Sequence, residues 1–336
     1  MQQPTVSIVT PVYKVKDYIA DCVQSVINQT YEKLEFILVD DCGGDNSIDI
    51  AESILKTASH PGFSYHIIRL EHNSGVSVAR NTAMKAATGD YIFCLDSDDK
   101  LLPECISHLV EKAELTNADI TLCDYTSGGN AQNRGGKLTA PVKHITTNAE
   151  CIHAFAKSWF NVAPWCKLLR RNFIESNQLY FKEGIINEDA PWTFQLCLNA
   201  QCMAFVNEKL YYYRDNQNSI MSLTQQEQMN IAGTYTLLLM SQEISQRQDL
   251  LLSLDGYLIW IRQVIIFYTR IYKKCDSKTF SENLKLLDKI IIDSPYAKVN
   301  ANVSKYYRLW NIVFILPKWF RRPYSYLIIW LQNKIS

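Results

Sequence analysis

Three aspartates within four residues, Asp96, Asp98 and Asp99, form the part of the chain best suited to chemistry. They follow the run 91–95, whose short, mostly apolar character predicts a buried strand. In an open parallel sheet, ligands bind at the carboxyl ends of the strands. Carboxylates this close repel one another unless a cation compensates them, and Mg²⁺ or Mn²⁺ prefers such oxygen ligands. The alternative is a solvated acidic turn that caps the next helix.

Acidic residues also follow two other predicted strands. The run 36–39 stops at Asp40 and Asp41, and the run 120–123 stops at Asp124. Strands that alternate with helices of this length indicate an α/β fold with a parallel sheet, in which acids from several strand ends lie at one edge. Two more strands are expected at 6–10, which Pro11 would end, and at 65–70; helical spacing of apolar residues predicts helices at 16–29, 47–58, 77–87, 104–116 and 190–199.

Length and composition limit the class of protein. A chain of 336 residues is long for one domain, so two are expected, and its formal net charge of zero argues against general nucleic-acid binding. The ten cysteines include no Cys-x-x-Cys pair and no zinc-like spacing, which favours reduced thiols in a cytoplasmic protein. No signal peptide is predicted. Neither Gly-x-Gly-x-x-Gly nor a P-loop motif is present, so a dinucleotide fold or a glycine phosphate cradle is not expected.

Several short motifs occur in a characteristic order. They are Val-Ser-Ile-Val-Thr-Pro-Val-Tyr at 6–13, Leu-Val-Asp-Asp at 38–41, Asn-Ser-Gly at 73–75, Ala-Arg-Asn at 79–81, Leu-Asp-Ser-Asp-Asp at 95–99, Trp-Cys-Lys at 165–167, Glu-Asp at 188–189 and Tyr-Tyr-Tyr-Arg at 211–214. In this order the chain resembles the family 2 glycosyltransferases. The resemblance implies a GT-A fold, which is a Rossmann-like, mostly parallel sheet flanked by helices. It also implies a nucleotide-sugar donor, a divalent metal and inverting transfer.

The resemblance assigns a nucleotide site to the strand ends. In that assignment Asp41 hydrogen-bonds the base, Arg80 contacts the base or the diphosphate, and Asp96 reaches the ribose or the metal. Alternatives remain for Arg80, as a helix-surface ion pair, and for Lys167, as a surface lysine instead of a partner for phosphate or acceptor. By resemblance, Asp98 and Asp96 would be the ligands for Mn²⁺ or Mg²⁺, and Asp99 would support them or cap the next helix. The nucleotide-binding set is Pro11, Val12, Tyr13, Asp41, Arg80, Asp96 and Lys167.

Inverting transfer needs a base on the sugar face opposite the nucleotide. A carboxylate can remove the proton of the acceptor hydroxyl as that oxygen attacks. By resemblance this base is Asp189, with Glu188 as its supporting neighbour. The alternative is that Asp189 only stabilises the positive N-terminus of the helix that it opens.

The chain changes in character after the resemblance ends. Residues 1–222 are expected to form the catalytic domain and 223–336 a helical extension, in which 257–272 is too short to cross a bilayer, where ~20 residues are needed. No acidic residue follows Asp293, and 306–330 interleaves aromatic and basic residues, as segments on anionic lipid do. We therefore predict peripheral membrane contact through 300–336. The alternative is a pair of helices packed on the catalytic domain.

The predicted function is metal-dependent transfer from a nucleotide sugar, with UDP-sugar favoured, to a hydroxyl of a glycan acceptor. Contact with a membrane suggests a lipid-linked glycan of a bacterial surface polysaccharide, on family analogy. Two other functions remain open. One is a sugar nucleotidyltransferase, although the Gly-rich basic loop that it needs after the first strand is missing. The other is a non-catalytic relative in a polysaccharide assembly complex.

Overall fold

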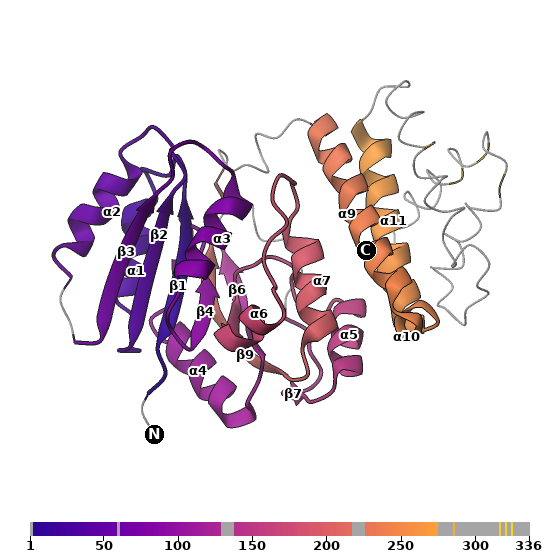
Figure 1. Ribbon diagram of the computed structural model, residues 1–336, viewed down its shortest axis with the longest axis horizontal. Coiled ribbons are helices and arrows are strands. Elements are labelled where there is room, and N and C mark those ends of the chain that lie inside the picture. The colour runs from indigo at the N-terminus through magenta and orange to yellow at the C-terminus, as the bar shows by residue number, and fades with distance from the viewer. Residues whose placement is uncertain are drawn as a thin grey trace. The chain divides into compact units, whose positions relative to one another are not determined.

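The computed structural model describes residues 3–58, 61–128, 138–216 and 226–274, with four isolated positions beyond them. The chain forms two compact units, Met1–Ser219 and Ile220–Ser336. The described part of the first unit is built on a nine-stranded sheet, and that of the second is helical (Figure 1).

Four parallel strands form the first half of the sheet. Their order is β3-β2-β1-β4, and β1 carries alternate side chains into two apolar layers, as its buried pattern shows. Contrary to the prediction, β1 does not end at Pro11, because this residue pairs in register with Val39. It is accommodated because β4 ends opposite Val9, so β1 has no ladder partner on that side at Pro11. The four strands are β1 (Val6–Val12), β2 (Leu34–Asp40), β3 (Phe63–Arg69) and β4 (Tyr91–Cys94).

The second half of the sheet mixes parallel and antiparallel pairs. β8 lies antiparallel to both β4 and β6, and β9 lies parallel to β6 but antiparallel to β5 and β7. Contrary to the prediction, β6 does not stop at Asp124. The pairing with β9 is irregular around that residue, and the strand continues to Ser127. The strands are β5 (Lys100–Leu101), β6 (Ile120–Ser127), β7 (His144–Ile145), β8 (Lys167–Arg170) and β9 (Met203–Tyr213).

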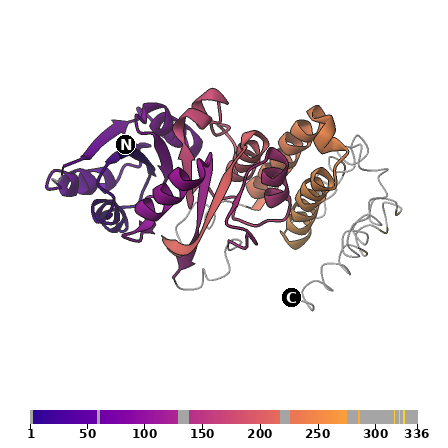
Figure 2. The ribbon, with the colours of Figure 1, turned by 90° about the horizontal axis from the view of Figure 1, so that it is seen from below.

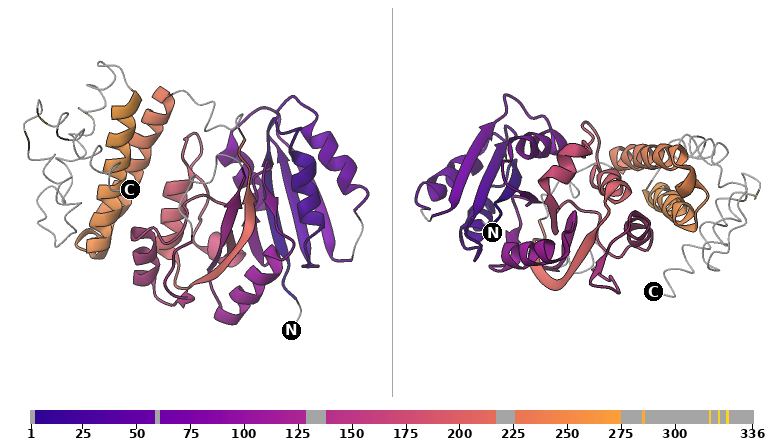
Figure 3. Two further views of the ribbon diagram at one scale, coloured as in Figure 1. Left: turned by 180° about the vertical axis from the view of Figure 1, so that it is seen from behind. Right: turned by 60° about the horizontal axis from the view of Figure 1, so that its bottom comes forward.

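Helices cover both faces of the sheet. α1 (Ile19–Ile27), α2 (Ser47–Leu55) and α4 (Cys105–Thr116) share one apolar core with the strands. α3 (Val76–Ala86) lies on the face opposite α1 (Figures 1 and 3), where its small residues Ala79 and Ala83 are fully buried. Three further helices accompany the second half of the sheet, and they are α5 (Asn148–Ala156), α6 (Arg171–Ser176) and α7 (Asp189–Asn199).

The second unit contains α9 (Gln226–Gln246), α10 (Gln248–Leu251) and α11 (Leu254–Lys274). α9 and α11 lie side by side, and α10 stands at the turn between them (Figures 1 and 2). The helix predicted at 257–272 lies within α11. None of the helices in the described residues combines the length and apolarity needed to cross a membrane. The segment 300–336, apart from isolated positions, lies outside the described residues.

Candidate active site

The loop between β4 and β5 carries the three aspartates, and Asp99 anchors it. Asp99 is 1% exposed. The Tyr211 hydroxyl donates to Asp99 Oδ2 at 2.6 Å, and the backbone N–H of Arg214 donates to Oδ1 at 2.8 Å. The same hydroxyl accepts a hydrogen bond of 3.3 Å from the backbone N–H of Asp96. Asp99 therefore fixes the loop to the end of β9, which agrees with a supporting role.

Negative charge in this loop is only partly compensated. Burial, followed by the neighbouring charge of Asp96, raises the pKa of Asp98 above its ordinary value. Burial and the charges of Asp98 and Asp96 raise the pKa of Asp99 well above its ordinary value. One compensating contact is the side-chain amide of Asn216, which donates to Asp98 Oδ2 at 2.8 Å. A hard divalent cation would stabilise these oxygens.

The donor chemistry of the loop limits how such a cation would be held. In the described ranges, no group of three His, Cys, Asp or Glu side chains is arranged to hold a metal ion. Mg²⁺ is commonly held by one or two carboxylates together with substrate phosphates and water. Asp98 and Asp96 fit that pattern, and a diphosphate would supply the remaining oxygens.

Arg80 on α3 joins the aspartate loop to the start of α7. One terminal nitrogen of its guanidinium lies 2.8 Å from Asp96 Oδ1, and the other lies 2.7 Å from Glu188 Oε1. Burial would lower the pKa of Arg80, but the two carboxylates raise it above its ordinary value, so the residue stays charged. Arg80 is thus a buried ion-pair partner and not the helix-surface pair considered as the alternative.

Asp189 begins α7 and is half-buried. Burial raises its pKa first, and the adjacent Glu188 raises it further, against the opposing effects of the Ala190 N–H, Arg80 and Lys167. Its Oδ1 accepts a hydrogen bond of 2.8 Å from the N–H of Ala190. A carboxylate with a raised pKa holds a proton more strongly, which suits a general base. The contact with the helix N-terminus is present as well, so both expectations for Asp189 fit this geometry.

The predicted base-binding residues lie at the ends of β1 and β2. Val12 is fully buried in the core, and its carbonyl accepts the N–H of Asp41, so only its main chain lies at the strand end. Both carboxylate oxygens of Asp41 accept backbone N–H groups, from Ser74 at 2.7 Å and from Gly75 at 3.0 Å. Asp41 therefore shapes the 73–75 turn in addition to any contact with a base. Tyr13, which follows β1, is partly exposed.

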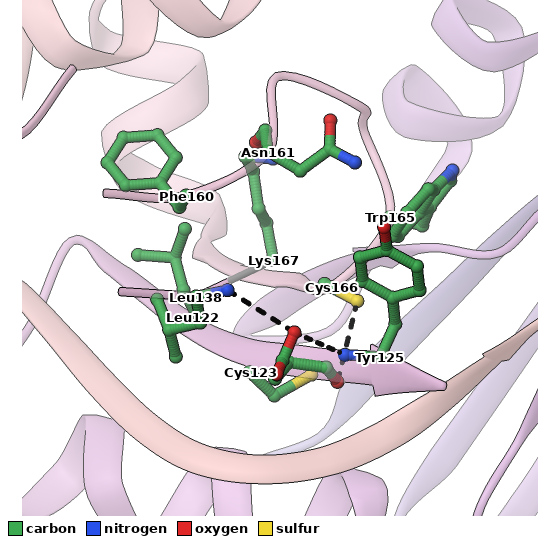
Figure 4. Close-up of a pocket in the computed structure, with 10 residues that line it drawn as sticks. Leu122, Cys123, Tyr125, Leu138, Phe160, Asn161, Trp165, Cys166 and Lys167 are labelled. Atoms are coloured by element: carbon green, nitrogen blue, oxygen red, sulfur yellow. Dashed lines mark hydrogen bonds between the residues drawn. The ribbon is translucent and has the colours of Figure 1, made fainter. Parts of the chain in front are cut away.

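Lys167 lies in a different environment from the one expected of it. It is 1% exposed, and it donates to the carbonyl oxygens of Asn161, at 2.7 Å, and Ala163. Figure 4 shows Lys167 beside Asn161 in the small pocket that both residues line. Burial lowers its pKa to about 8. The ammonium thus ties the 161–163 loop to β8, and the surface-lysine alternative is wrong.

Asp124 lines the same small pocket as Lys167, within β6. Its Oδ1 accepts the backbone N–H groups of Tyr125, at 2.9 Å, and Leu138, at 3.3 Å. The expectation that Asp124 joins the other acids at a strand end is not met, because β6 continues past it.

The sequence did not predict a cluster of four aromatic rings, Tyr125, Trp165, Tyr211 and Tyr213, of which Tyr211 contacts the aspartate loop. Trp165 stacks on Tyr211, with ring centroids 4.9 Å apart, and on Tyr213, at 5.5 Å, while Tyr125 meets Trp165 edge-on at 5.0 Å. The motifs at 165–167 and 211–214 contain three of these rings. Their contact depends on the pairing of β6, β8 and β9, which the sequence pattern does not reveal.

The model of the family named Glycosyl transferase family 2 matches residues 7–177. The chain belongs to this family.

Two curated relatives come from Bacillus subtilis strain 168. The uncharacterized glycosyltransferase EpsJ is 33% identical over 231 residues, which are 66% of this chain and 64% of EpsJ. The putative glycosyltransferase EpsH is 27% identical over 87% of this chain and 85% of EpsH. The match to EpsJ therefore spans slightly less than two thirds of that protein.

Solved structures confirm the fold. Residues 1–349 of S. aureus TarS, in complex with UDP-GlcNAc, superpose with a TM-score of 0.73 at 19% identity, over 96% of this chain and 89% of that one. The mannosyltransferase PcManGT from Pyrobaculum calidifontis, in complex with GDP-Man and Mn²⁺, gives a TM-score of 0.56 at 12% identity, over 98% and 87% of the two chains. The predicted GT-A fold with a helical C-terminal extension is confirmed, with the refinement that only the first half of its sheet is wholly parallel.

Proposed function

We propose that this chain is a metal-dependent, inverting glycosyltransferase that moves a sugar from a UDP-sugar to a hydroxyl group of a glycan. The observation that carries the proposal is the Arg80 bridge. One guanidinium binds both Asp96, in the acidic loop, and Glu188, beside Asp189. In this proposal, the acids suited to holding the metal and the acid suited to activating an acceptor are therefore linked through one side chain.

The donor would bind at the ends of β1, β2 and β4. Pro11, Tyr13 and the main chain of Val12 would line the base, with Asp41 as a hydrogen-bond partner and Asp96 at the ribose. The UDP and UDP-GlcNAc complexes of TarS support a uridine nucleotide. Mn²⁺ or Mg²⁺ on Asp98 and Asp96 would neutralise the charge that develops on the departing diphosphate; the PcManGT complex with Mn²⁺ supports a metal of this kind.

Asp189 would act as the base. It removes the proton of the acceptor hydroxyl while that oxygen bonds to the anomeric carbon and the bond from that carbon to the diphosphate breaks, so the configuration inverts. Glu188 keeps Asp189 basic through its neighbouring charge. The ammonium of Lys167 is bound to the carbonyls of the 161–163 loop, so Lys167 would hold that loop in place and would not contact phosphate.

The acceptor class rests on the relatives. TarS of Staphylococcus aureus is named a poly(ribitol-phosphate) β-N-acetylglucosaminyltransferase, and TuaG of Bacillus subtilis a putative teichuronic acid biosynthesis glycosyltransferase. These names support a polymer of the bacterial cell surface as acceptor, on a lipid carrier if the basic segment 300–336 contacts the cytoplasmic face of the membrane. The non-catalytic alternative is less favoured, because Asp41, Asp96, Asp98 and Asp189 are all present.

Release of UDP tests the proposal. The protein is incubated with a panel of UDP-sugars and Mn²⁺, with and without EDTA, and free UDP is measured. We expect metal-dependent release from at least one sugar nucleotide. Asp98→Asn should reduce it at least tenfold, whereas Asp49→Asn, an exposed acid on α2, should leave it unchanged. Release that survives both EDTA and Asp98→Asn would contradict a metal-dependent reaction.

A further inference from the structure

Two consecutive residues of α3 hold a segment that lies a hundred residues further along the chain. Asn81 is 3% exposed. Its Oδ1 accepts the backbone N–H of Phe181 at 2.8 Å, and its Nδ2 donates to the carbonyl of Phe181 at 2.9 Å and to Glu183 Oε1 at 3.1 Å. One side-chain amide thus pairs with both backbone groups of Phe181, as a neighbouring strand would.

Arg80 holds the same segment at its other end. It binds Glu188 and Asp96 as described, and its guanidinium carbon lies 5.3 Å from the centre of the Phe181 ring. That ring stacks on Trp192 of α7, with centroids 4.1 Å apart. The indole N–H of Trp192 donates to Leu179 at 3.0 Å. The contacts of Arg80 and Asn81 therefore extend from the segment into the helix that Asp189 begins.

The segment has little regular structure of its own. No helix or strand lies between Ser176, where α6 ends, and Asp189. Residues 182–184 are exposed, and Gly184 and Asn187 have positive φ angles of 74° and 61°. Apart from Phe181, no residue of 181–189 is a buried apolar side chain, so the geometry of the segment depends largely on specific hydrogen bonds.

We propose that Arg80 and Asn81 are positioning residues that fix the 181–189 segment against the aspartate loop. The inference rests on the proposed function, because it concerns where Asp189 stands relative to the donor. Asn81 gives the cleaner test, since its amide bonds to Phe181 and Glu183, which are not residues of the proposed donor site. A misplacement of about 1 Å at a reacting group can cost about 100-fold in rate.

The first experiment separates catalysis from donor binding. For Asn81→Ala we expect kcat to fall about 10- to 100-fold, while the Kd for UDP with Mn²⁺, measured by calorimetry, changes less than about twofold. The matched control is Asn148→Ala, because the Asn148 amide donates to three carbonyls at the far end of α7, at 3.1, 3.0 and 2.8 Å. The control should lower Tm and leave kcat unchanged.

The Arg80 variants give a graded result. Arg80→Lys keeps one positive charge and should retain more activity than Arg80→Met, which leaves two carboxylates without their partner. If Asn81→Ala behaves like the Asn148 control, or if it weakens UDP binding tenfold at unchanged kcat, the positioning role is refuted.

A second readout does not need turnover. Hydrogen exchange of the peptide covering 181–189 should become faster in Asn81→Ala and stay unchanged in Asn148→Ala. Unchanged exchange in Asn81→Ala would overturn the inference even if the enzyme is active. Faster exchange in a protein that releases no UDP would support the positioning role and count against the proposed function instead.

Discussion

Single side chains set the proton affinity of the proposed base. Besides burial, one negative neighbour, Glu188, and two positive ones, Arg80 and Lys167, affect the pKa of Asp189. The negative neighbour raises its pKa and the positive ones lower it. Since Asp189 must be deprotonated to accept a proton, activity should rise with pH as its carboxyl group ionises.

Opposite charge changes should therefore shift the acidic limb of the pH profile in opposite directions. Glu188→Gln removes a negative charge, lowers the pKa of Asp189 and should move the limb to lower pH. Arg80→Met removes a positive charge and should move it to higher pH. The measurement is kcat/KM of transfer against pH for both variants and the wild type. If the acidic limbs of the two variants shift in the same direction relative to the wild type, a group other than Asp189 controls the pH profile.

The residue identities were more predictable than their partners. Asp96 and Asp98 were selected because they closely follow a predicted strand, and Asp189 was selected from the order of short motifs. The Arg80–Glu188 pair had no signal in the sequence, because its members are 108 residues apart and lie on no common element. The contact of Asn81 had no signal in the sequence either, because its amide bonds to the backbone of Phe181, 100 residues away. Such contacts are set by the packing of α3 and not by local pattern.

At the scale of elements, β9 supports the acidic loop. The Tyr211 hydroxyl, at the end of β9, binds both Asp99 and the N–H of Asp96, and its ring stacks on Trp165. Since Asp99 is buried, loss of this hydroxyl would leave a carboxylate oxygen without its donor, a loss of about 1–3 kcal/mol. β9 thus fixes the conformation of the aspartate loop in the absence of a ligand.

Tyr211→Phe should lower the free energy of unfolding by about 1–3 kcal/mol and weaken binding of UDP with Mn²⁺. A matched control is Tyr91→Phe, since the Tyr91 hydroxyl donates to Glu114, on α4. Chemical denaturation and calorimetry measure the two effects. Both variants should lose stability, and only Tyr211→Phe should lose affinity. Equal affinities would mean that the loop keeps its shape without Tyr211.

The sequence predicted the first half of the sheet well and the second half poorly. β1, β2 and β4 are mostly apolar runs and β3 is a half-exposed edge strand, and helices separate the four, so their pattern is local. β9 escaped prediction because its middle residues, 207–209, are exposed and polar, and β8 because it begins with the buried Lys167. β5 and β7 have two residues each and exist only through their pairing with β9. Strands of this kind are defined by their neighbours.

At the scale of the whole chain, the basic segment 300–336 predicts contact with an anionic membrane surface. Each Lys or Arg near an anionic membrane surface contributes about 1 kcal/mol. We therefore expect the triple variant Lys318→Gln, Arg321→Gln and Arg322→Gln to lower flotation of the full chain with phosphatidylglycerol vesicles by about 100-fold in partition coefficient.

Two controls accompany the flotation experiment. Vesicles of phosphatidylcholine alone should recover little of either protein. Neutralising three lysines of the first unit, Lys112, Lys143 and Lys157, should leave flotation unchanged, because these residues lie outside the basic segment. Equal flotation of the wild type and of the variant changed at 318, 321 and 322 would remove the basis for membrane contact.

The most direct test of the account is Asp189→Asn, because it removes the proposed base while preserving the size and shape of the side chain. General bases contribute about 10²- to 10⁴-fold to rate. The account predicts that transfer by the variant falls by that factor while the Kd for UDP-sugar with Mn²⁺ stays within about twofold of wild type. Transfer at the wild-type rate would contradict it.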